Sequence, residues 1–190
     1  MRKLPLILLL AGFSLPLLSH AEQNCLWLNP ATAGGVLGGP VTLTVSQADP
    51  HPANVHPSNA TSASGPISAD ASANTYAGNI VDDSDCVFDR QPLTAGKLHI
   101  KVRTISEPHK MFATYTAQCG AHAVPLKAIG NEATACRLKG KDGRPYEQVV
   151  GRIRDRIFVL ELSIGDPSIT PATLEEKARS TAEIVAGNLF

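Results

Sequence analysis

Hydrophobic and polar residues alternate along parts of this chain with the period of two that is typical of a half-buried β-strand. The clearest case is residues 98–103, in which Leu98, Ile100 and Val102 share one face while a His, a Lys and an Arg occupy the other. Such a pattern favours an antiparallel sheet with one covered face. Shorter or more apolar runs predict five further strands, at residues 41–45, 85–88, 135–138, 146–153 and 157–164.

Three segments carry helix start signals followed by apolar residues at helical spacing. Asn29 is a favourable N-cap before a proline, and the short helix that it opens is expected to end at Gly38. Ser106 is expected to cap a second helix that ends at Gly120. Thr170, followed by Pro171, opens the last helix, whose apolar stripe is expected to pack on a sheet.

The order of these elements is helix, three strands, helix, three strands, helix. Asp142-Gly143 and Arg154-Asp155 are turn sequences that join consecutive strands into hairpins. The predicted fold class is therefore α+β, with a mainly antiparallel sheet, helices packed on one face and two disulfides.

Residues 46–79 differ in kind, because they are rich in Ser, Ala, Asn, Pro and Asp and contain almost no large apolar side chains. Such a segment cannot bury enough surface to offset its ordering entropy, so it is predicted to be a long flexible loop. Residues 22–45 are too few to form a separate core. Residues 22–190 are therefore predicted to form a single domain that contains this loop.

The first residues have the three parts of a secretory signal. Arg2 and Lys3 form a positive start, residues 4–18 form an apolar run, and Ser19-His20-Ala21 provides a small-x-small cleavage site. Residues 1–21 are predicted to be a signal peptide that is removed before Glu22, which makes the protein periplasmic or secreted. The apolar run is short for a membrane-spanning helix, which needs about 20 residues, and no stable membrane span is expected.

All four cysteines lie in the predicted mature part of the chain, where an even count indicates disulfides. Four cysteines allow three pairings, and the sequence alone does not choose among them. The sequential pairing is favoured because Cys119 at a helix end can reach Cys136 in the next strand, while Cys25 and Cys86 can tie the first helix to the strand after the loop. Their spacing fits no structural zinc pattern. Cys25 also lacks the small apolar residues that precede a lipid-attachment cysteine.

Net charge bears on the class of partner. The chain has 17 basic and 17 acidic side chains, and removal of Arg2 and Lys3 with the leader would leave the mature part slightly acidic. A nucleic-acid partner needs a basic surface that displaces counterions from phosphate, so none is expected.

Several features together resemble a secreted domain family of unknown function that is common among actinobacterial lipoproteins, and, in outline, extracellular sensor domains of bacterial Ser/Thr kinases. They are C-x-W-L-N-x-x-T-A-x-x-V-L-G-G at residues 25–39, Cys86-Val87-Phe88, I-G-N-E-A at 129–133, V-G-R-x-R-D-x-I-F-V-L at 150–160 and the Ala-rich last helix. The resemblance implies a disulfide-linked α+β sandwich with a shallow groove, and it brings no catalytic residue.

No motif for a catalytic nucleophile, a zinc protease, a phosphate-binding loop or a dinucleotide site is present, so no catalytic residue and no cofactor are assigned. His51 and His56, beside Asp49, are the only candidates for a loose Zn²⁺ or Cu²⁺ site, and a solvated polar loop is the favoured interpretation. His99, His109 and His122 are expected to be ordinary surface residues.

Two function hypotheses from different classes remain open, with a third, weaker option beside them. The favoured one is an exported, non-enzymatic binding or sensor module, with a protein or small molecule in a groove between sheet and helices. The alternatives are an exported, hydrolase-like enzyme with an unrecognised site and an inhibitor that presents the 46–79 loop. A pocket lined by paired titratable groups would favour the enzyme.

Overall fold

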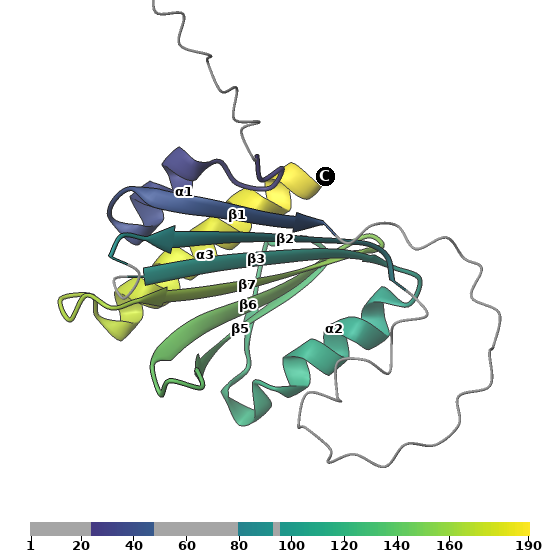
Figure 1. The fold of residues 1–190 in the computed structure, drawn as a ribbon. Coiled ribbons are helices and arrows are strands. Elements are labelled where there is room, and N and C mark those ends of the chain that lie inside the picture. The colour runs from purple at the N-terminus through teal and green to yellow at the C-terminus, as the bar shows by residue number, and fades with distance from the viewer. Residues whose placement is uncertain (1–23, 48–79, 93–95) are drawn as a thin grey trace, which may run out of the picture.

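Seven strands lie side by side in one antiparallel sheet, in the order β1-β2-β3-β7-β6-β5-β4 (Figure 1). The computed structural model describes residues 24–47, 80–92 and 96–190. The strands are β1 (Val41–Gln47), β2 (Ile80–Arg90), β3 (Gly96–Ile105), β4 (Val124–Leu126), β5 (Glu132–Lys139), β6 (Pro145–Ile153) and β7 (Arg156–Ile164). The helices are α1 (Pro30–Leu37), α2 (Pro108–Ala117) and α3 (Pro171–Leu189), with a short 3₁₀ helix, η2 (Gly120–His122). The predicted α+β class is confirmed.

Helices α1 and α3 cover one face of the sheet, and the main core lies between them and the strands (Figure 1). The alternating residues Leu98, Ile100 and Val102 of β3 all point into this core, as their pattern predicts. Gly151 of β6 lies opposite Phe158 of β7, where a Cβ would lie 2.2 Å from Cε1 of the phenyl ring. Only glycine leaves space for this buried ring.

Helix α2 packs on the opposite face of the sheet, so the expected placement of helices on one face holds for α1 and α3 but not for α2. Met111 of α2 is buried against a second apolar cluster, with Phe112 and Tyr115 at its border. This cluster exists because the outward face of the sheet is locally apolar; its strand residues are Ile105, Val150, Ile157 and Val159. The α2 helix is therefore held by a smaller core than α1 and α3.

Both disulfides form in the predicted sequential pairing. Cys25 bonds to Cys86, with their Cα atoms 5.8 Å apart, and ties the segment before α1 to β2. Cys119 bonds to Cys136, with their Cα atoms 5.6 Å apart, and ties the end of α2 to β5. Each bridge thus joins a segment next to a helix to the sheet.

The ends of the elements confirm some local expectations and correct others. The Asn29 side chain caps α1, and the Thr170 side chain caps α3 by accepting from the Thr173 N–H. The expected cap at Ser106 is wrong, because Glu107 occupies the N-cap position of α2 and makes no side-chain capping bond. The expected end at Gly120 is also wrong, since α2 ends at Ala117 and Gly120 begins η2. Strand β4 is an addition that the sequence pattern did not reveal.

Strand β1 continues through Ser46 and Gln47, which pair with Asp85 and Ser84 of β2. The prediction of a loop is therefore wrong for these two residues. The rest of that segment and the predicted signal peptide, residues 1–21, lie outside the described residues. Across the described ranges, no helix is long and apolar enough to cross a membrane.

Candidate functional site

The candidate metal ligands His51 and His56 lie outside the described residues. Within the described part of the chain, no group of three or more His, Cys, Asp or Glu side chains is placed to hold a metal ion. All four cysteines are in disulfides, so the protein has no free thiol.

His99 is not the ordinary surface residue that the sequence indicates, because its ring lies between two carboxylates. Nε2 of His99 lies 2.7 Å from Oδ1 of Asp85 on β2, and Nδ1 lies 3.5 Å from Oε2 of Glu161 on β7. The hydrogen bonds with Asp85 and Glu161 raise the pKa of His99 from 6.5 to about 9, although burial opposes the rise. The imidazole is therefore protonated at neutral pH.

The pKa values of the two carboxylates shift in the opposite direction to that of His99. Burial favours a higher pKa for Asp85, but the hydrogen bond with His99 and the charge of Lys101 outweigh it, so the pKa of Asp85 is lowered. The hydrogen bond with His99 lowers the pKa of Glu161 as well. These shifts describe a satisfied ionic network across β2, β3 and β7.

A second cluster of polar side chains lies on the same face of the sheet as His99 and links the sheet to α2. Arg103 of β3 pairs with Asp83 of β2 at 3.0 Å and donates to the Tyr115 hydroxyl of α2 at 2.6 Å. Burial raises the pKa of Tyr115, so the phenol stays neutral. Every charged side chain in the two groups is paired, although Oδ1 of Asp83 is buried without a hydrogen-bond partner among the described residues, and we assign both groups to the support of the fold.

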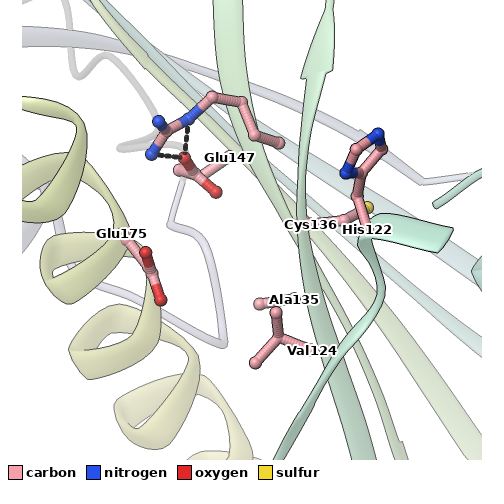
Figure 2. A pocket seen from close by; sticks show the side chains of 7 residues that line it. His122, Val124, Ala135, Cys136, Glu147 and Glu175 are labelled. Atoms are coloured by element: carbon pink, nitrogen blue, oxygen red, sulfur yellow. Dashed lines mark hydrogen bonds and ion pairs between the residues drawn. The ribbon is translucent and has the colours of Figure 1, made fainter.

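A cavity of about 390 Å³ lies at the other edge of the sheet, beside β5 and the first turns of α3. Figure 2 shows its side chains arriving from both sides of β5. We call it the edge pocket; its lining residues are His122, Val124, Ala135, Cys136, Arg137, Glu147 and Glu175.

Glu147 is the charged residue at the base of the edge pocket. Only 3% of its side chain is exposed, and the Arg137 guanidinium contacts its Oε1 through two nitrogens. Burial raises the pKa of Glu147, the Arg137 hydrogen bond and charge lower it, and the charge of Glu175 raises it further, with a net rise. Arg137 also donates to the Pro171 carbonyl at 2.8 Å, which fixes the start of α3 against β5.

Glu175 completes the acidic side of the edge pocket. It lies on an exposed part of α3, and its carboxylate points toward the space between the helix and β5 (Figure 2). His122 of η2 and the Cys136 sulfur form the opposite wall, and Val124 and Ala135 form an apolar part. The pocket therefore combines one buried carboxylate, one exposed carboxylate, one guanidinium and an apolar lining.

Larger grooves run along the end of the sheet near Lys97 and Arg144, with volumes of about 450 and 650 Å³. Their charged lining residues are exposed or only half-buried. We favour the edge pocket because it contains a buried charged group, Glu147. Burial of a charge costs free energy, and an apolar residue in its place would stabilise the fold as well or better, so the charge is better explained by a function.

The sequence did not identify this site, although it contained one signal. Glu147 lies in the predicted strand at residues 146–153, on the same face as the apolar Val149 and Ile153. A carboxylate in register with a buried face is unusual unless it is paired. Its partners Arg137 and Glu175 come from β5 and α3, and the pattern of a single strand does not reveal them.

Comparison with protein-family models finds no match for this chain, and comparison with curated proteins finds no matching relative. The resemblance to secreted domains of unknown function and to kinase sensor domains therefore stays a prediction.

Proposed function

We propose that this protein is an exported binding module and that the edge pocket holds a cationic group of its ligand. Two disulfides and the leader-like residues 1–21 support export, because disulfides persist in oxidising compartments. The observation that carries the proposal is Glu147, a buried carboxylate that opens onto a pocket with a second carboxylate at its mouth.

The charge of the pocket selects the ligand. Arg137 balances one of the two carboxylates, which leaves the site with about one negative charge in a partly dry environment, where Coulomb attraction is stronger than in water. An ammonium or guanidinium group would neutralise the site. The apolar wall formed by Val124 and Ala135 suits the methylene stem of a lysine-like or arginine-like side chain.

Binding fits this geometry better than acid catalysis. A general acid must release a proton near neutral pH, which needs a pKa raised toward that range. Burial raises the pKa of Glu147, but the Arg137 guanidinium stabilises the ionised form and opposes that rise. The pKa of Glu147 is raised on balance, but two nitrogens of the Arg137 guanidinium contact its carboxylate, which favours recognition of charge over proton transfer.

The test is a titration followed by amide NMR shifts, with Nα-acetyl-lysine methylamide as the probe and its norleucine analogue as the uncharged control. The lysine probe should shift amides of residues 135–137, 147 and 175, and the norleucine probe should not. Glu175→Gln should weaken binding about three- to fivefold, as expected for one partly exposed charge pair. Glu183→Gln, on the outer surface of the same helix, should leave it unchanged.

Absence of shifts with the lysine probe at millimolar concentrations, or equal shifts with both probes, would contradict a cation site. Shifts confined to the grooves near Lys97 would place binding elsewhere.

A further inference from the structure

Strand β5 is only partly covered at the outer edge of the sheet. It spans Glu132–Lys139, but β4 pairs only with its residues Ala133, Thr134 and Ala135. In the part of the chain that the structure describes, no strand pairs with residues 136–139 on that side. A partly uncovered edge strand presents backbone N–H and C=O groups that can pair with another strand.

The hydrogen-bond alternation identifies which residues present those groups. Beyond the end of β5, the Gly140 N–H donates to the Arg144 carbonyl at 2.8 Å, which continues the register of the β5–β6 ladder. Because antiparallel pairs alternate along a ladder, the even-numbered residues of β5 point their backbone groups at β6. The N–H and C=O groups of Arg137 and Lys139 therefore point outward.

Proline in β4 agrees with this assignment. Pro125 lies opposite Thr134, an even-numbered residue whose backbone groups point away from β4. The missing N–H of Pro125 therefore costs no ladder hydrogen bond. The backbone groups of Ala133 and Ala135 point toward β4. Those of the next odd-numbered residues, Arg137 and Lys139, point to the same side, beyond the end of β4.

The edge pocket occupies the space in which a longer β4 would lie. Its lining includes residues from both faces of the sheet, with Glu147 and Glu175 on the α3 side and Cys136 and His122 on the other side (Figure 2). A cavity that straddles a sheet edge in this way fits an extended chain better than it fits a compact small molecule.

We propose that an extended segment of a partner protein pairs with residues 136–139 of β5 and places a lysine or arginine side chain in the edge pocket. This inference rests on the proposed function and names the class of ligand. The side chain of Lys139 lies on the same sheet face as Arg137, so an acidic residue two positions from the basic one would lie beside it. In antiparallel pairing, as between β4 and β5, the residue opposite Lys139 precedes the residue opposite Arg137, so the recognised pattern is acidic-x-basic in an extended strand.

The segment belongs to a partner because the chain's own connection between β1 and β2 lacks the required charge. Residues 48–79 contain no lysine and no arginine. A Lys or Arg of a partner protein would neutralise the site.

The test uses the capped peptide acetyl-Val-Glu-Val-Lys-Val-amide in two N-methylated forms with identical side chains. Methylation of the Lys and Glu nitrogens removes the N–H groups that would face Arg137 and Lys139, and binding should fall by about tenfold or more, the effect of two lost hydrogen bonds. Methylation of the second and third valine nitrogens removes N–H groups that would face solvent, and binding should persist.

Amide hydrogen exchange supplies the second measurement. The unmethylated peptide should slow exchange at Arg137 and Lys139, while amides of β1, the strand at the opposite edge of the sheet, should not change. Equal binding by both methylated forms, or protection at β1 instead, would overturn strand pairing. If acetyl-lysine methylamide binds and the peptide does not, strand pairing fails while the cation site stands. If neither binds, both proposals fall.

Discussion

At the scale of single residues, His99 shows how a polar position on a strand acquires a role from its neighbours. Its alternation with Ile100 places it on the face away from the main core. Its partners come from the two flanking strands, Asp85 from β2 and Glu161 from β7. The result is a protonated imidazole shared by two carboxylates.

This arrangement predicts a pH dependence of stability. The pKa of His99 is raised from 6.5 to about 9, so its contribution is complete below pH 6.5 and is lost as the pH rises through about 9. The contribution should be about 2–3 kcal/mol, because one pKa unit corresponds to about 1.4 kcal/mol and the ring is partly solvated. Urea unfolding of the natural protein and of His99→Gln should show a stability difference that shrinks from pH 6.5 to 9.

A matched control is His109→Gln. His109 is 75% exposed and pairs with Glu132 at 3.1 Å, so its replacement should change the free energy of unfolding little at any pH in this range. A stability difference for His99→Gln that is constant from pH 6 to about 9.5 would contradict the His99 network.

The sequence predicted which side chains of these strands are buried, but not which strands are neighbours. Alternation is a local property, and it placed Leu98, Ile100 and Val102 in the core correctly. The pairing of β3 with β7 joins residues far apart in sequence, so the contact between His99 and Glu161 could not be read from the pattern. Glu147 was missed for the same reason, because Arg137 and Glu175 approach it from other elements.

At the scale of elements, α2 is the helix that most depends on specific links. It contributes one buried residue, Met111, whereas α3 buries a stripe from Leu174 to Leu189. The Cys119–Cys136 bridge and the hydrogen bond from Arg103 to Tyr115 both attach its C-terminal end to the sheet. The short strand β4, which follows it, was too brief for its three residues to show a period.

Removal of the Cys119–Cys136 bridge should therefore loosen α2 before the rest of the fold. The double variant Cys119→Ala/Cys136→Ala should lose about 3 kcal/mol on the loop-closure model, and amides of α2 and η2 should exchange faster. Binding of the acetyl-lysine probe should also weaken, since His122 and Cys136 form one wall of the edge pocket. Hydrogen exchange and urea unfolding measure these effects.

The matched control is Cys25→Ala/Cys86→Ala, which opens a loop with a sequence separation of 61. It should cost about 4 kcal/mol and loosen the segment before α1, with α2 amides unaffected at matched stability. Faster exchange of α2 amides in both double variants would show that α2 has no separate dependence on its own bridge.

At the scale of the whole molecule, the connection between β1 and β2 and the edge pocket lie at opposite edges of the sheet. Strands β1 and β2 form one edge, and β5 with β4 forms the other, where the edge pocket lies. The connection between β1 and β2 leaves from the edge opposite the pocket. Gln47, the last described residue before it, pairs with Ser84 of β2.

Shortening of the connection between β1 and β2 tests whether the edge pocket binds its ligand independently of that connection. Replacement of residues 49–75 with a linker of about six Gly and Ser residues should change the free energy of unfolding by only about 1 kcal/mol, because loop-closure entropy depends on the logarithm of length. Binding of acetyl-lysine methylamide should be unchanged, since the residues that line the pocket are all retained. Any Zn²⁺ binding by His51 and His56 should disappear, as it should in the full-length His51→Ala/His56→Ala variant.

Unfolding of the shortened protein would show that the replaced residues pack against the core. Loss of probe binding in a shortened protein that still folds would place the recognition element in that connection and not at the β5 edge.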